Sequence, residues 1–292
     1  MFSASADATR PTALIVVFVS GVEAYTEAVH GLGAALAKAS PTPTFIDLKA
    51  PNGEIELGQA LGAPQQRIVI TIGSEALASV NAHKIEDLVI PSMILRSDRP
   101  RAAQSGLASP RPPAVYLDLP LTSLINELRT LLPGKNRLGI IRNSSRAEAD
   151  PSVSARVRQQ GFTLDVAECS RPEDLVKSFL SLKGKADFVV VLPDSTLYNS
   201  TTVRPLILAS LESRLPIVGF SSSFVRAGAA VAIYPDFKDI GWQTADLVQK
   251  LIAGRTGLAD ESPRKLQVAV NQRVLRLLGL NCNETPGLVI FR

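Results

Sequence analysis

Short apolar runs alternate along this chain with longer stretches whose apolar residues recur at every third or fourth position. The runs at 13–19 (ALIVVFV), 67–72 (RIVITI) and 188–192 (FVVVL) have the length and composition of buried strands. The stretches at 23–39 and 202–213 have the period of amphipathic helices. Strands that alternate with helices form βαβ units, in which the strands lie parallel in one sheet. The pattern therefore predicts an α/β fold built on parallel sheets.

This alternation continues through the whole chain and falls into two similar halves. A single hydrophobic core stops growing at about 250 to 300 residues, so a chain of 292 residues is expected to form two lobes, each a small doubly wound parallel sheet. Segment 97–113 is rich in proline, serine and arginine and has no period, which predicts a surface loop beside a lobe boundary. Strands are predicted at 13–19, 44–48, 67–72, 89–95, 115–119, 137–141, 163–167, 188–192, 216–220, 229–234 and 266–270. Helices are predicted at 23–39, 59–62, 76–80, 121–132, 150–160, 173–182, 202–213, 222–227, 236–254 and 271–280.

The composition excludes several classes of protein. Hydrophobic residues make up 46% of the chain and charged residues 20%, as in an ordinary folded globular protein. The 31 basic and 27 acidic residues give a net charge of +4 without a dense basic block, which argues against nucleic acid as a partner. The longest apolar stretch, 13–22, is too short for a membrane-spanning helix, which needs ~20 residues. Residues 1–11 lack the basic start and apolar region of a secretory signal, so the protein is either cytosolic or has lost a leader.

Cysteine and histidine, which metal sites, redox sites and many enzymes need, are scarce in this chain. The chain has two cysteines, Cys169 and Cys282, with no CxxC pair and no histidine cluster, so we expect no metal, no cofactor and two free buried thiols, with a disulfide as the alternative. Segment 219–223 (GFSSS) lacks the second glycine of a nucleophile elbow. The two histidines, His30 and His83, are expected on the surface or in helix packing. A hydrolase would need His83 to reach a serine, and we therefore expect a protein that is not an enzyme.

Small and polar residues follow five of the predicted strands. In open parallel sheets, ligands bind beyond the carboxyl ends of the strands, where the backbone N–H groups of the next helices point outward. A single serine there is more often a helix N-cap than a ligand contact, and the repetition at five strands carries the prediction. The predicted ligand-binding residues at strand ends are Ser20, Gly21, Gly73, Ser74, Asn143, Ser144, Asp194, Ser195, Ser221 and Ser222. Four aromatic residues close to these ends join them: Tyr25, Tyr198, Phe220 and Tyr234.

For two of these residues, Asp194 and Ser74, a structural role as a helix cap is the alternative. Asp194 follows a buried strand, where its carboxylate would hydrogen-bond a ligand ammonium or hydroxyl; the alternative is that it caps the helix after it. Ser74 stands where the N-cap of the next helix belongs, and Asn271 is the expected N-cap of the last helix. Trp242 is expected to pack its helix against the sheet.

Three segments of the second half resemble a known family. They read DFVVVLPDSTLYNS at 187–200, LPIVGFSSSFVRAGAAVAIYPDFKDIGWQTADLVQKLIAGR at 215–255, and VAVNQRVLRLLGL at 268–280. In this order they resemble the ABC-transporter substrate-binding proteins of the TrpX-like family, which have the type I periplasmic-binding fold. The resemblance covers most of residues 131–280. Segment 97–113 departs from the family, which usually has an Asp-Pro pair and a glycine-rich turn there.

The resemblance implies two lobes that close around a small ligand without chemistry. It implies one lobe of residues 10–119 plus 236–264 and a second of residues 120–235 plus 265–292, joined by a hinge of three crossovers. It also implies a polar or zwitterionic ligand such as an amino acid, held at the positions of Ser20, Ser74, Asp194 and Ser222. The implied partner is a membrane permease, the implied location the periplasm or cell envelope, and we expect a monomer. A sensor module of the same fold remains the alternative.

Overall fold

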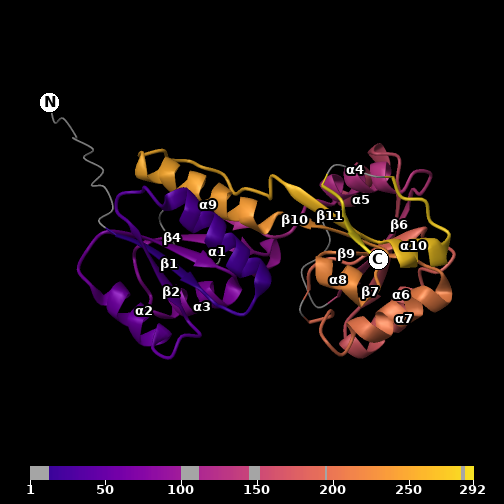
Figure 1. Ribbon diagram of the computed structural model, residues 1–292, viewed down its shortest axis with the longest axis horizontal. Helices are drawn as coiled ribbons and strands as arrows, with labels where there is room; N and C mark the ends of the chain where they lie inside the picture. The colour runs from indigo at the N-terminus through magenta and orange to yellow at the C-terminus, as the bar shows by residue number, and fades with distance from the viewer. Residues whose placement is uncertain (1–12, 100–111, 145–151, 195, 284–286) are drawn as a thin grey trace. The chain divides into compact units, whose positions relative to one another are not determined.

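A computed structural model of the chain describes residues 13–99, 112–144, 152–194, 196–283 and 287–292 (Figure 1). The chain forms two compact units, and we describe each by itself. Unit 1 comprises residues 1–117 and 235–265, and unit 2 comprises residues 118–234 and 266–292. The chain therefore passes from one unit to the other three times.

Unit 1 is built on a five-stranded sheet in the order β2-β1-β3-β4-β5, whose neighbouring strands all run parallel. Two helices cover each face, as Figure 1 shows. The strands are β1 (Ala13–Phe18), β2 (Pro43–Asp47), β3 (Arg67–Ile72), β4 (Leu88–Ile94) and β5 (Val115–Tyr116). The helices are α1 (Glu23–Leu36), α2 (Gly53–Gly62), α3 (Ser74–Ala82) and α9 (Phe237–Ile252), with a 3₁₀ turn η1 (Arg96–Asp98) after β4.

Alternate residues of the central strand β1 enter different cores, because successive side chains of a strand point to opposite faces. Leu14 and Val16 pack under α1 and α9, whereas Ile15 and Val17 pack under α2 and α3. The α1 and α9 helices approach each other closely through glycines. A Cβ atom on Gly241 would lie 2.1 Å from the carbonyl oxygen of Ala28, so only glycine fits there.

Unit 2 is built on a seven-stranded sheet in the order β12-β11-β10-β9-β8-β6-β7. β6 runs parallel to β7 and β8, β9 to β8 and β10, and β11 to β12. The strands are β6 (Arg137–Asn143), β7 (Thr163–Cys169), β8 (Phe188–Val190), β9 (Ile217–Gly219), β10 (Val231–Pro235), β11 (Leu266–Asn271) and β12 (Val289–Phe291). One core lies under α4 (Leu121–Leu131), α5 (Ser152–Gln159) and α10 (Gln272–Leu278). The other lies under α6 (Leu175–Leu180), which follows the 3₁₀ turn η3 (Pro172–Asp174), α7 (Val203–Ser213) and α8 (Ser222–Ala227).

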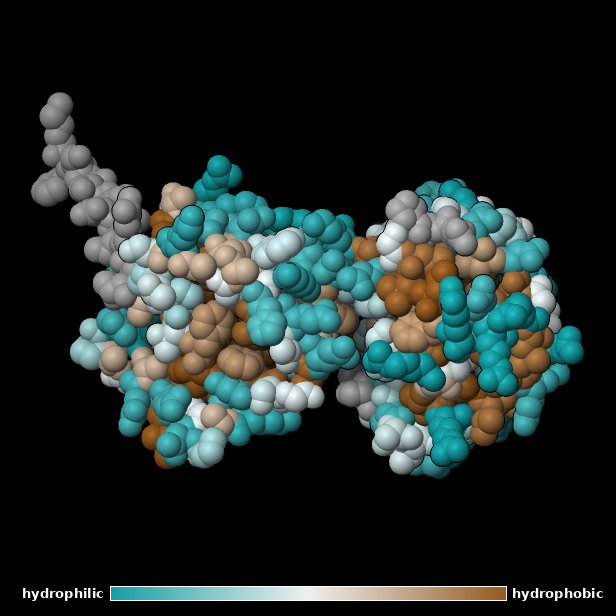
Figure 2. All heavy atoms as spheres, viewed as in Figure 1, coloured by the Kyte–Doolittle hydropathy of each residue, from teal (hydrophilic) through white to brown (hydrophobic). Residues whose placement is uncertain are grey.

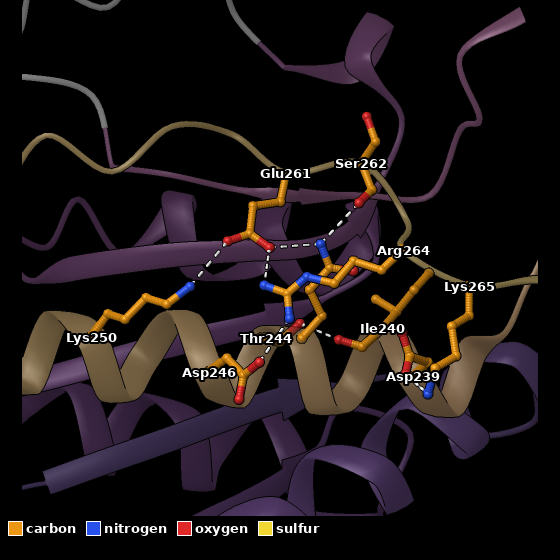
Figure 3. Close-up of polar contacts among 10 residues, drawn as sticks. Asp239, Ile240, Thr244, Asp246, Lys250, Glu261, Ser262, Arg264 and Lys265 are labelled. Carbon is orange, nitrogen blue, oxygen red and sulfur yellow. Dashed lines mark hydrogen bonds and ion pairs between the residues drawn. The ribbon is translucent and has the colours of Figure 1, made fainter. Parts of the chain in front are cut away.

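The segment that returns from α9 to β11 is fastened to α9 by polar contacts (Figure 3). The carboxylate of Glu261 accepts hydrogen bonds from Gln243 Nε2 and from a guanidinium nitrogen of Arg264, each at 2.7 Å. Lys265, at the end of this segment, forms an ion pair of 2.7 Å with Asp239. These contacts hold the last residues of unit 1 against the helix before the chain enters unit 2.

The α/β architecture predicted from the sequence is confirmed, while several local predictions are wrong. Gly73, with a φ of +90°, occupies the N-cap position that Ser74 was expected to take, because the turn there needs a positive φ. Trp242 is 41% exposed instead of packed, since α9 contacts α1 through the neighbouring Gly241. The short strand β12 was not predicted. Asn271 does cap the last helix, through a hydrogen bond from Val274 N at 3.0 Å.

Three further predictions concern cysteines, membranes and the proline-rich loop. Both cysteines are free thiols, Cys169 buried and Cys282 partly exposed. Among the described residues, no helix has the length and apolar character needed to cross a membrane. Most of the predicted loop at 97–113 lies outside the described residues, although its first residues belong to η1.

Candidate functional site

The end of β1 is joined to the end of β2 by hydrogen bonds. The backbone N–H groups of Ser20 and Lys49 both donate to Asp47 Oδ1, each at 3.0 Å. Burial alone would raise the pKa of Asp47, but the hydrogen bonds from Ser20 and Lys49 outweigh it and lower that pKa. Ser20 is partly exposed, and the adjacent Gly21 is exposed with a φ of +85°. These two predicted residues lie at the surface of unit 1.

The ends of β3 and β4 meet at a cluster that includes three predicted residues. The ring of Tyr25 lies against Gly73, where a Cβ atom would be 2.6 Å from Cζ of the tyrosine. Ser74 Oγ donates a hydrogen bond of 3.0 Å to Oδ2 of Asp98, an exposed residue of η1. The pKa of Tyr25 is raised by burial first, and then by the nearby carboxylates of Glu75 and Asp98. The structure thus groups Tyr25, Gly73 and Ser74 with an acid that the sequence reading missed.

A second set of unpredicted residues lies beside η1. The guanidinium carbon of Arg96 is 4.1 Å from the centre of the Tyr116 ring, a cation–π contact, and Arg96 also donates to Ser262 Oγ at 2.6 Å. The Tyr116 hydroxyl donates to Asp260 at 2.6 Å, and burial together with Asp260 raises the pKa of Tyr116. Basic and acidic side chains, Arg96, Asp98 and Asp260, therefore lie near the end of β4 in unit 1. The sequence did not single these residues out, because Tyr116 lies in a predicted strand and Arg96 and Asp260 lie between predicted elements.

In unit 2, Asp194 is a structural residue of the turn after β8. Its Oδ1 accepts hydrogen bonds from the backbone N–H groups of Thr196 and Leu197, at 2.9 and 3.2 Å, and its Oδ2 accepts one from Asn143 Nδ2 at 3.1 Å. Asp194 is only 8% exposed. These contacts favour the capping alternative, with one correction: α7 begins at Val203, so Asp194 caps a turn and not a helix. The expected open carboxylate is not found, and Ser195 lies outside the described residues.

Three aromatic side chains cluster at the ends of β8 and β9. The centre of the Tyr198 ring lies 6.1 Å from that of Phe220 and 6.2 Å from that of Phe224, and the two phenylalanine rings are 4.7 Å apart. The Tyr198 hydroxyl is buried and has no hydrogen-bond partner among the described residues. Burial, with smaller contributions from Asp194 and Cys169, raises the pKa of Tyr198 far above its ordinary value. Tyr198 is thus a core residue, while Phe220 remains partly exposed.

The remaining predicted residues of unit 2 differ in exposure. Ser221 is the N-cap residue of α8 without a side-chain hydrogen bond to the helix, and Ser222 begins that helix; both are partly exposed. Ser144 is exposed, and its backbone N–H donates to the Cys169 carbonyl at 3.1 Å. Tyr234 is buried within β10. The predicted polar residues of unit 2 that are accessible therefore lie at the ends of β6 and β9.

Neither a metal centre nor a catalytic pair is evident among the residues described. No group of histidine, cysteine or acidic side chains in that part of the chain is arranged to hold a metal ion. His30 and His83 are both exposed. No hydrogen bond joins either histidine to a serine within the described ranges.

Comparison with known proteins gives one family match. A family model described as "ABC transporter substrate binding protein" matches residues 15–286 of this chain. The match spans both units. No curated protein matches the chain.

Solved structures resemble the whole chain at low sequence identity. A substrate binding protein with adhesive properties from Clostridium difficile, in its ligand-free open form, is 14% identical with a TM-score of 0.71; the match covers 96% of this chain and 99% of that one. A conserved domain protein from Vibrio cholerae is 18% identical with a TM-score of 0.64, covering 94% and 96%. An ABC domain in complex with L-Trp from Streptococcus pneumonia is 17% identical with a TM-score of 0.61, covering 95% and 100%. These likenesses establish the type I periplasmic-binding-protein fold.

Proposed function

Because the chain belongs to the ABC transporter substrate-binding protein family, we propose that it captures a small zwitterionic ligand, an amino acid in particular, for import through a membrane permease. The observation that carries the proposal is the family match over residues 15–286. The accessible polar groups at the carboxyl ends of parallel strands support it, because ligands of open α/β sheets bind at these ends. The proposal places the protein outside the cytoplasm.

In unit 1 we assign the charged groups of the ligand to the ends of β3 and β4. The N-terminus of α3 begins at Ser74, and a helix N-terminus favours a carboxylate because its first backbone N–H groups lack partners in the helix. Asp98, exposed and hydrogen-bonded to Ser74 Oγ, is suited to an ammonium group. A carboxylate site and a cation site side by side match an α-amino acid. Asp98 thus replaces Asp194, whose oxygens are used within unit 2, as the residue proposed to bind the cation.

In unit 2 we propose the end of β9 as a second set of groups suited to such a ligand. Phe220 is partly exposed and offers apolar surface, and Ser221 and Ser222 beside it offer hydroxyl groups. The structure with L-Trp, whose fold this chain shares, supports an amino-acid ligand as a proposal for this chain. Aromatic side chains with a few polar groups are typical of small-molecule sites.

The first experiment identifies the ligand. Native mass spectrometry of the purified protein should detect a co-purified small molecule by its mass, and calorimetric titration with amino acids and simple sugars should then measure its affinity. A ligand at about 100 times its Kd stabilises the folded protein by about 2.7 kcal/mol, which a thermal melt detects. Binding of sugars alone would contradict the amino-acid proposal.

A variant tests the assignment of Asp98. Asp98→Asn keeps the shape of the side chain and removes its charge, so we expect affinity for a cationic or zwitterionic ligand to fall about tenfold, with the melting temperature of the empty protein unchanged. The matched control is Asp246→Asn on α9, an acid that forms an ion pair of 2.7 Å with Arg264. Equal affinities for the two variants would show that Asp98 does not contact the ligand.

Two alternative functions are distinguished by separate measurements. A sensor of the same fold would bind the ligand equally well, but it would not support ligand uptake when supplied to vesicles that contain the permease. A hydrolase needs a base within hydrogen-bond reach of its nucleophile. A screen with esters and amides that found turnover, lost in Ser221→Ala or Ser222→Ala, would overturn the binding proposal.

A further inference from the structure

Unit 2 carries an apolar groove between α6 and α7. Two adjoining hollows, of about 240 and 470 Å³, form this groove and share Val176 and Pro205 in their walls. Two of the exposed leucines of the chain lie on it, Leu180 at 43% and Leu208 at 54% exposure. Figure 2 shows hydrophobic residues interspersed with hydrophilic ones where α6 and α7 lie. We call the groove and these residues the α6/α7 groove.

The spacing of the apolar residues suits contact with another protein surface. Val176 and Leu180 are four residues apart on α6, and Pro205, Leu208 and Ala209 follow the three- and four-residue spacing of one face of α7. Such a continuous apolar strip is normally covered by another element, and a large one left exposed marks an interaction surface. Among the described residues of unit 2, the core under α6 and α7 is formed by other side chains, such as Phe179 and Leu206. Leu180 and Leu208 are therefore not part of that core.

The charges of the groove indicate what covers it. Lys183 and Glu212 both line the larger hollow. Neither side chain forms an ion pair or a hydrogen bond among the described residues. Glu173 lines the smaller hollow, so the groove holds one base and two acids, and its larger hollow holds one of each. The larger hollow is therefore complementary in charge to a second copy of itself. A two-fold axis through such a patch places each Lys183 opposite Glu212 of the partner subunit, because both copies present the same surface.

We propose that the α6/α7 groove is the contact surface of a symmetric dimer, in which a second copy of this chain covers Leu180 and Leu208 and pairs Lys183 with the partner's Glu212. The contact joins two outer faces of unit 2. The protein would then be the expected monomer only at low concentration.

The dimer should be weak, because the groove is small. Stable interfaces bury about 1,600 Å² in total, and a patch between two short helices offers less. We therefore expect half of the chains to be in dimers at a protein concentration of about 100 µM. At about 1 µM we expect only the monomer. The protein would associate where it is concentrated, as in a confined compartment, and dissociate on dilution.

Sedimentation velocity over a concentration series tests the proposal directly. The full chain should move from the monomer to the dimer sedimentation coefficient between about 1 and 500 µM. Leu208→Glu should abolish the shift by placing a charge in the apolar contact. The control is Leu277→Glu on α10, a leucine of 61% exposure outside the groove, which should dimerise as the parent does. A parent chain that stays monomeric at about 500 µM, or equal effects of both substitutions, would overturn the proposal.

Charge reversal then tests the pairing. Lys183→Glu alone places two acids in contact across the axis, and Glu212→Lys alone places two bases there, so each single variant should dimerise about tenfold more weakly. An equimolar mixture of the two variants should restore dimerisation, because the introduced acid of one variant then faces the introduced base of the other. Lys185→Glu, an exposed lysine outside the hollows, is the control for added negative charge. Failure of the mixture to associate better than either variant alone would refute the pairing.

Discussion

The strand ends of unit 1 and unit 2 look alike in the sequence but are used differently in the structure. In unit 1, Ser74 and Asp98 lie at the surface and contact each other from the ends of two strands. In unit 2, Asp194 and Tyr198 are buried, and the carboxylate of Asp194 holds the turn that follows β8. An acid after a buried strand therefore does not by itself indicate a ligand contact. The role of such an acid depends on whether the backbone N–H groups of the following turn need its carboxylate as a hydrogen-bond acceptor.

The strongest test of this difference is Asp194→Ala in the empty protein. The substitution removes the acceptor of the Asn143 amide and of two backbone N–H groups, all within unit 2. We expect a loss of about 3 kcal/mol in the free energy of unfolding, because buried donors then lack their partner. Urea denaturation measures it, with Asp174→Ala, which removes a surface ion pair with Arg171, as the control. A stability equal to that of the control would contradict the structural role of Asp194.

Gly73→Ala should have the next largest effect and probes unit 1. Gly73 has a φ of +90°, and the added Cβ would lie 2.6 Å from Cζ of Tyr25, so strain and displacement of the ring together should cost about 2 kcal/mol. Gly21→Ala is a matched control: its φ is +85°, but the nearest atom to its Cβ is Lys49 Nζ at 3.8 Å. The difference between the two melting curves isolates the contact with Tyr25. If both variants lose the same stability, Tyr25 does not depend on Gly73.

Tyr198→Phe should change stability less and in the opposite direction. The Tyr198 hydroxyl is buried without a hydrogen-bond partner among the described residues, so its removal relieves an unfavourable burial. We expect a gain of up to about 1 kcal/mol in the free energy of unfolding and no change in ligand affinity. Calorimetry of the empty protein and titration with its ligand measure both quantities. A loss of affinity would show that the hydroxyl serves the ligand and would remove the contrast between the two units.

The smallest effect concerns acid pH and Asp47. The fold lowers the pKa of Asp47 below its unfolded value of about 3.9, so the stabilisation is complete above that pH and is lost as the pH falls through the lower folded pKa. Urea denaturation at about pH 5 and about pH 3 should therefore show a slightly smaller loss of stability in Asp47→Asn than in the parent. Identical losses would show that the ionisation of Asp47 does not contribute to stability.

Much of the fold was predictable because strands and helices leave periodic patterns in the sequence. The alternate residues of 13–19 enter opposite cores, as the run of apolar residues predicts for a strand covered on both faces. The strand β12 escaped prediction because it has three residues and gains its pairing only from β11. Trp242 was misplaced since the period of α9 does not show which of two adjacent residues, Gly241 or Trp242, meets α1.

The sequence predicted polar residues at the strand ends, but it did not identify every residue that gathers there in the structure. Tyr25, Gly73 and Ser74 were predicted at strand ends, and the structure brings them together. Asp98 and Arg96 were missed because they lie in a segment without a pattern. Their positions depend on contacts with Ser74 and Ser262, which are distant along the chain.

The sequence by itself determined the α/β class, the parallel strands and the presence of polar residues where these strands end, because these properties depend on local periodicity and on the order of elements. Only the tertiary structure decided that Asp194 serves its own turn and that Asp98 is exposed beside Ser74. The physical reason is that a side chain's role depends on its hydrogen-bond partners and its burial, which arise from residues brought together by folding.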